Sequence, residues 1–146
     1  MENNIYQMYN SKTIKSKECI EIQLGKQKKK KFKDTSVFFN NESFVPLEKT
    51  LWNNFREYQP YTNVKISSKE WIKIIKGFKK LSVSLKENVF QDELQYQLGF
   101  ISSEDKQQYE SDFGSINRNI DDMLLGFIAW IEPLLQNNDF ITICGK

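Results

Sequence analysis

The chain has 146 residues, 39% of them hydrophobic and 14% aromatic, and a net charge of +2. This length predicts a single domain, residues 1–146, whose core is large enough to need no disulfide or metal. No histidine is present, so Cys–His nucleophiles, Ser–His–Asp triads and zinc deaminases are excluded. The two cysteines are too few for a closed zinc site made of Cys and His ligands.

No stretch has the apolar run of a signal peptide or a membrane helix, so we expect a cytoplasmic protein without membrane contact. Cys19 and Cys144 lie in predicted strands at opposite ends of the chain. Buried, reduced thiols are the simpler interpretation, and a disulfide between them is the alternative. The sequence contains no EF-hand, Walker or GxGxxG motif, and we therefore predict no cofactor and no bound metal.

Charge is distributed unevenly along the chain. Residues 1–86 hold 18 Lys and Arg against 8 Asp and Glu, a net +10, whereas residues 87–146 hold 3 against 11, a net −8. If the two parts of the sequence form different surfaces, the protein presents opposite charges to different partners.

The first 40 residues predict a β-hairpin. Residues 1–16 are weakly patterned and indicate either a short edge strand or a loosely attached tail. Residues 18–24 alternate apolar and polar side chains as a half-buried strand does, and residues 35–40 are rich in β-formers. The lysine-rich segment between them, residues 26–31, is either a phosphate-binding loop or, as we prefer, a solvated hairpin tip whose charges protect a sheet edge.

Two helices follow, separated by a short extended segment. We expect the first over residues 44–58, capped by Asn41 or Ser43. Its core face consists of Leu47, Leu51, Trp52 and Phe55. The second begins at a capping box formed by Ser67 and Glu70. Its apolar stripe consists of Trp71, Ile74, Ile75, Phe78, Leu81 and Leu85, and its opposite face carries Lys69, Lys73, Lys76 and Lys80. This lysine face is either solvated or a ridge for phosphate.

Residues 87–113 combine carboxylates with aromatic side chains. We expect two short helices here, one ending near Gly99 and one running from Ser102 or Ser103 to about Phe113. The mixture is typical of surfaces that bind basic proteins, and a polar helical linker is the alternative. The candidate partner-binding residues are Glu87, Asp92, Glu93, Tyr96, Glu104, Asp105, Tyr109, Glu110 and Asp112. Glycosidases also use paired carboxylates, but nothing indicates a sugar-binding cleft, and we expect no enzyme activity.

The C-terminal segment predicts a central helix that begins at Ser115 as N-cap. Apolar residues recur at three- and four-residue steps, namely Ile116, Ile120, Met123, Leu124, Phe127, Ile128 and Ile131. Leu125, Ala129 and Trp130 occupy the other side, so we expect a helix buried nearly all round. Pro133 should end or kink it, and residues 140–144 form a strand. The sequence therefore predicts an α+β fold: a small antiparallel sheet of the N-terminal hairpin and the C-terminal strand, packed against three or more helices, with the last long helix central.

Three segments occur together: VFFNNESF at 37–44, ISSKEWIKII at 66–75, and the closing helix followed by FITICGK. This arrangement resembles the small α+β immunity proteins of bacterial polymorphic toxin systems, including contact-dependent growth inhibition. The resemblance implies a non-catalytic cytoplasmic protein that binds the C-terminal domain of a cognate toxin, often a basic nuclease, and blocks its active site or substrate access. It transfers no site residue. A nucleic-acid-binding module that uses the lysine-rich loop and the lysine face is the alternative function.

Overall fold

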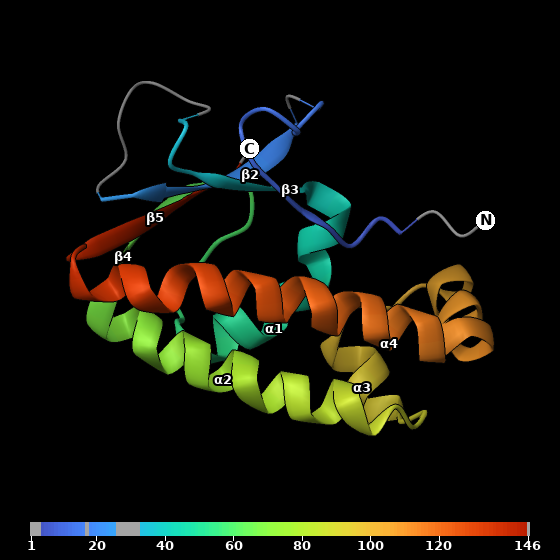
Figure 1. The fold of residues 1–146 in the computed structure, drawn as a ribbon. Helices are drawn as coiled ribbons and strands as arrows, with labels where there is room; N and C mark the ends of the chain where they lie inside the picture. Colours follow the sequence, from blue (N-terminus) through green and yellow to red (C-terminus); the bar gives the residue numbers. More distant parts are fainter. Residues whose placement is uncertain (1–3, 17, 26–32, 146) are drawn as a thin grey trace.

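A computed structural model describes residues 4–16, 18–25 and 33–145 (Figure 1). The elements are, in chain order, β1 (Met8–Tyr9), β2 (Cys19–Leu24), β3 (Val37–Asn40), α1 (Asn41–Asn54), β4 (Asn63–Ser67), α2 (Ser68–Glu87), α3 (Asp92–Gln97), α4 (Ser103–Ile131), the 3₁₀ helix η1 (Glu132–Gln136) and β5 (Phe140–Cys144). Figure 1 shows the sheet as one layer and the helices as a second layer beneath it. The predicted α+β fold with a long last helix is confirmed.

The sheet has the order β1-β3-β2-β5-β4, and each pair of neighbouring strands is antiparallel. The predicted hairpin and the predicted C-terminal strand therefore meet, with Ile22 opposite Ile143. Residues 18–24 were expected to be half-buried, and this is wrong, because Glu21 and Gln23 are only 4% and 0% exposed. The hydroxyl of Ser36 and the amide of Lys33 donate to Glu21 Oε2, at 2.7 and 3.0 Å, which compensates the buried carboxylate.

Strands near both ends of the described chain pair within the sheet. β1 pairs with β3, with Met8 opposite Phe39, so the N-terminal segment forms an edge strand. Beyond it, the Ser43 hydroxyl donates a hydrogen bond to the Ile5 carbonyl. Cys19 and Cys144, on the neighbouring strands β2 and β5, are both buried as expected. The lysine-rich segment 26–31 lies outside the described residues, and its predicted role stays a prediction.

α1 differs from its prediction at both ends. It begins at Asn41 and ends at Asn54, and its N-cap residue is Asn40, for which no capping side-chain bond is found among the described residues. Trp52 was expected in the core but is 45% exposed, with the Arg56 guanidinium 3.8 Å above its ring. The reason is that Phe44, Leu47 and Leu51 already define the buried face. Trp52 follows Leu51 by one residue, a turn of about 100° away from that face.

α2 follows its prediction closely. The Ser67 hydroxyl accepts from the Glu70 amide at 3.2 Å, as the predicted cap requires. All six residues of the apolar stripe are buried. Trp71 also donates its indole N–H to the Ile141 carbonyl at 2.9 Å, which fixes α2 to β5. On the outside, the lysines of the opposite face are exposed.

α4 agrees with its prediction only in part. Two helical segments meet at a kink at Asp112, where the backbone is non-helical (φ −137°, ψ 25°), so the predicted change of helix near Gly114 occurs two residues earlier and Ser115 is not an N-cap. The Ser102 hydroxyl caps the start of α4 by accepting from the Asp105 amide at 3.1 Å, as one of the two predicted alternatives requires. The later turns are not buried all round, because Leu125 is 39% exposed and Ala129 faces solvent. α4 contacts α2 and the sheet, and its remaining side stays open (Figure 1).

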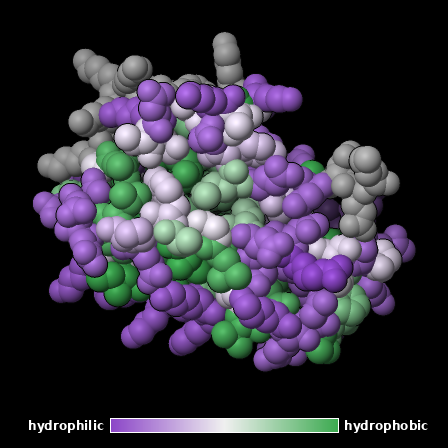
Figure 2. All heavy atoms as spheres, in the orientation of Figure 1, coloured by the Kyte–Doolittle hydropathy of each residue, from purple (hydrophilic) through white to green (hydrophobic). Residues whose placement is uncertain are grey.

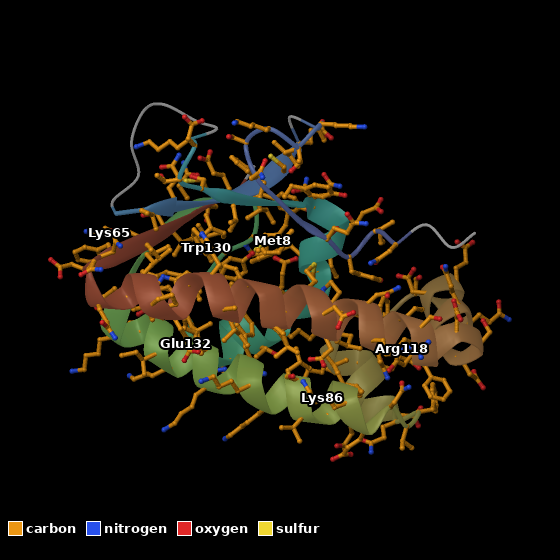
Figure 3. The ribbon with its side chains drawn as sticks, viewed as in Figure 1. Met8, Lys65, Lys86, Arg118, Trp130 and Glu132 are labelled. Atoms are coloured by element: carbon orange, nitrogen blue, oxygen red, sulfur yellow. The ribbon has the colours of Figure 1, made fainter. Side chains whose placement is uncertain are left out.

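Two ion pairs join α2 to α4 and to η1 (Figure 3). The Lys86 ammonium lies 2.9 Å from Asp121 Oδ2, and the Ser82 hydroxyl donates to the other oxygen of the same buried carboxylate at 2.5 Å. Lys79 lies 2.8 Å from Glu132 at the end of α4, in a more exposed pair. The Lys86 side chain is 55% exposed, so the hydrogen bond from Ser82 to the buried Asp121 carboxylate, more than the ion pair, holds α4 against α2.

Phe127 stands at the centre of the core. Its ring centroid lies 5.6 Å from that of Phe39 on β3, 5.9 Å from Trp71 and 6.1 Å from Phe78 on α2, and 6.0 Å from Trp130 on α4. These are distances of tilted and edge-on aromatic contacts, which add to the stabilisation from burial alone. One side chain thus joins the sheet, α2 and α4.

Phe127→Ala should lower the free energy of unfolding by about 3–5 kcal/mol, because it opens a cavity between three elements. Trp130→Ala should lower it by only about 1–2 kcal/mol, since the Trp130 ring is half-buried and loses less contact. Urea unfolding followed by circular dichroism measures both. Equal losses would contradict the central position given to Phe127.

Candidate functional site

The structure does not gather all the predicted partner-binding residues on one surface. Glu87 ends α2, Asp92 and Glu93 occupy the first turn of α3, and Glu104 the first turn of α4; with Glu110 they are exposed. None of these five lines a cleft with the others. Asp105 and Asp112, by contrast, line the same cleft. The acidic segment therefore contains one concave site and several separate exposed carboxylates.

Tyr109 was predicted to contact a partner. This prediction is wrong for the folded chain, because the Tyr109 side chain is 0% exposed. Its ring stacks on that of Phe100 at 5.1 Å, and its hydroxyl donates to Asn117 Oδ1 at 2.8 Å. Burial raises the pKa of the Tyr109 phenol. Tyr109 thus belongs to the core, where it supports the base of the cleft.

Tyr96 is exposed as predicted, at 64%. The Lys49 ammonium from α1 lies 3.1 Å from the centroid of its ring and donates to the Tyr96 carbonyl at 2.9 Å. The ring is therefore already occupied by a cation of the same chain on one face. This contact holds α3 against α1 and makes Tyr96 a weaker candidate for partner contact than the cleft residues.

The cleft lies between the N-terminal segment, the start of α1, the turn after α3 and the first half of α4, and has a volume of about 550 Å³. Figure 1 shows the N-terminal segment passing above the first half of α4. Three carboxylates line it, those of Glu42, Asp105 and Asp112. Among the described residues that line it, none is Lys or Arg. The cleft is therefore acidic, without a cation of its own in its lining.

α4 places its cleft residues by helical spacing. Asp105, Gln108 and Asp112 are three and four residues apart and lie on one face of the helix. On the other side, Gly99 lets the preceding turn approach α1, because its φ is +87° and an added Cβ would lie 2.9 Å from Val45 Cγ1. Both the positive φ and the close approach require glycine. The turn carries Phe100 into the cleft wall.

The pKa of the Tyr6 phenol depends on the negative charge of the cleft. Burial, and to a smaller extent the carboxylates of Asp105 and Glu42, together raise the pKa of Tyr6 to about 12. Within the part of the chain that the structure describes, the Tyr6 hydroxyl has no hydrogen-bond partner. Sequence analysis missed both Tyr6 and Glu42, because their approach to Asp105 is a long-range contact without a local signal.

Within residues 4–16, 18–25 and 33–145, no group of three or more Asp, Glu, Cys or His residues is arranged to hold a metal. The same residues contain no helix with both the length and the apolar content of a membrane span. Figure 2 shows hydrophilic residues dominating the surface over the first half of α4, whereas apolar residues gather between the sheet and its second half. Recognition of a charged partner therefore fits this end of the molecule.

A second, basic cleft of about 560 Å³ lies between α1 and α2. Lys73, Lys76 and Lys80 line it, so three of the four lysines of the predicted ridge gather there, together with Asn53 and Gln97. Lys73 lies 3.7 Å from Glu70, in a partly exposed pair. Ammonium and amide groups are phosphate ligands, which keeps the alternative function open to test.

No protein-family model, curated protein or solved structure matches this chain. The choice of function therefore rests on the geometry and charge of the two clefts and on the resemblance seen in the sequence.

Replacing Glu42 with Gln and Asp105 with Asn should lower the pKa of Tyr6 from about 12 toward the ordinary value of 10.0. The two charges disfavour the phenolate, so their removal eases ionisation, while burial, the larger cause, keeps the pKa above 10.0. The ¹³Cζ shift of Tyr6, assigned with Tyr6→Phe, follows the titration over the pH range in which circular dichroism shows the fold. Glu104→Gln with Glu110→Gln is the control and should leave the midpoint unchanged; an equal change in both variants would contradict the cleft geometry.

Proposed function

We propose that this chain is an immunity-type binding protein that neutralises a basic bacterial toxin domain in the cytoplasm, by covering its active site or blocking substrate access. The single observation that carries the proposal is the cleft lined by Glu42, Asp105 and Asp112 without a lysine or arginine among its described lining residues. The resemblance to immunity proteins supplies the class of partner. The cleft supplies a surface of matching charge.

The carboxylates have two different roles in this proposal. Those of the cleft contact the partner directly, where a bound partner that excludes water would make each charge pair stronger than on an open surface. Exposed carboxylates such as Glu104 and Glu110 act at longer range and raise the rate of encounter with a basic domain. The first group should therefore control affinity and the second the salt dependence of association.

Asp105→Lys with Asp112→Lys should weaken binding of the toxin domain by about 100-fold, because two attractive contacts become repulsive inside the interface. Glu104→Lys with Glu110→Lys introduces the same charge change on the same helix outside the cleft. It should weaken binding by less than about 10-fold, mainly through slower association at low salt. Surface plasmon resonance with the C-terminal domain of the toxin encoded immediately upstream measures both rates.

Unfolding midpoints of the two double variants provide the control for folding. Equal losses of affinity would place the interface on the exposed acidic residues instead of the cleft. Absence of a complex between the wild-type chain and the encoded toxin domain would reject the immunity function altogether.

The second candidate function is nucleic-acid binding, favoured by the gathering of Lys73, Lys76 and Lys80 in one cleft. Phosphate contacts by these lysines would make oligonucleotide affinity fall steeply with salt. Replacing the three with Ser, and separately replacing residues 28–31 with Ser, tests the helix face and the loop. Fluorescence anisotropy with a labelled oligonucleotide that is unchanged by both sets would reject this function.

A further inference from the structure

We propose that the acidic cleft receives an arginine side chain that the partner presents on an exposed segment, with the guanidinium held by the carboxylates of Asp105, Asp112 and Glu42. The inference deepens the proposed function and rests on it only in taking the partner to be a protein. It names the chemical group that the cleft recognises.

Charge is the first argument. Three carboxylates line a cleft whose described lining contains no lysine or arginine. A cationic group that enters the cleft would therefore meet carboxylates with no cationic partner in the described lining. Guanidinium groups bind carboxylates with two parallel hydrogen bonds, a geometry that an ammonium lacks.

The shape of the walls is the second argument. The lining also contains five apolar residues, namely Ile5, Val45, Pro46, Phe100 and Ile116. A long side chain with an apolar stem and a charged end can pack its methylenes on these residues while the end reaches the carboxylates. Guanidinium groups also stack on aromatic rings, as Arg56 does on Trp52 in this chain. A small inorganic cation would use none of these apolar residues.

The walls are held by contacts that the lining residues make with one another and with neighbouring residues. The hydrogen bond from Ser43 to the Ile5 carbonyl holds the N-terminal segment. The bond from Tyr109 to Asn117, 2.8 Å long, spans the distorted turn of α4 at Asp112. Gly99 fits the opposite turn closely against Val45. The cleft is thus preformed, and binding needs little ordering of its walls.

Titration of the ¹⁵N-labelled chain with three capped tripeptides tests the inference: acetyl-Gly-Arg-Gly-amide, its lysine counterpart, and its citrulline counterpart, which keeps the shape of arginine without the charge. The arginine peptide, added up to about 20 mM, should shift the amide signals of Tyr6, Asp105 and Asn119 in a saturable way. Its dissociation constant should be at least about fivefold lower than that of the lysine peptide, and the citrulline peptide should bind most weakly.

Asp105→Asn with Asp112→Asn preserves the shape of the cleft and should abolish these shifts, whereas Glu104→Gln with Glu110→Gln should retain them. Equal shifts from the arginine and citrulline peptides, no saturable shift, or shifts outside the cleft would each overturn the inference, and none of these needs a variant to fold. If the arginine peptide does not bind, binding of the toxin domain can still be measured. If the toxin domain does not bind, the peptide result still stands, so the two experiments test the two proposals separately.

Discussion

The packing of Phe127 between the sheet and α2 is the contact on which the rest of the molecule depends. Phe127 lies on α4, and its neighbours Phe39, Trp71 and Phe78 come from the two other parts of the core. α4 runs from Ser103 to Ile131 with a kink at Asp112, so the packing of Phe127 fixes its second half, and the first half continues from that kink. The cleft wall is in that first half. The core and the candidate site are therefore consequences of the same helix.

The distortion at Asp112 sets the direction of the first half of α4 relative to the half that packs in the core. A helix interior that departs from helical φ and ψ loses backbone hydrogen bonds and needs other contacts to hold it. Here the side chains of Tyr109 and Asn117 bond across the distortion, and the ring of Tyr109 packs on Phe100. Tyr109, expected at an interface, instead holds the geometry that places Asp105 and Asp112 at the cleft.

The sequence predicted correctly those features that depend only on residues close together in the chain. The Ser67 cap and the apolar stripe of α2 depend on residues close in sequence, and both are confirmed. Trp52 was placed wrongly because helical spacing alone does not say which of two adjacent apolar residues meets the sheet. A break was predicted before Gly114, and the structure has a kink at Asp112, two residues earlier, because a glycine inside a helix costs only about 1 kcal/mol and does not by itself fix the position of a break.

The sequence predicted only some of the residues of the candidate site, because the others reach it through long-range contacts. Asp105 and Asp112 stood out because they lie in an acidic segment of the chain. Glu42 lies in the basic part of the sequence, and only the contact of α1 with the N-terminal segment and α4 brings it into the cleft. The charge of a sequence segment therefore indicates which element carries part of a site. The complete set of residues at that site depends on long-range packing.

A net charge of +2 is compatible with recognition of a basic partner because charges act locally in salt. At physiological ionic strength the screening length is about 8 Å, so a docking side chain responds mainly to the groups around it. The acidic cleft and the lysine cleft have no described lining residue in common. Both border α1, but among the described lining residues those of α4 belong only to the first and those of α2 only to the second. A guanidinium at the cleft would therefore interact chiefly with its three carboxylates. The lysines of α2 can at the same time keep the whole chain close to neutral, which limits self-repulsion in the folded state.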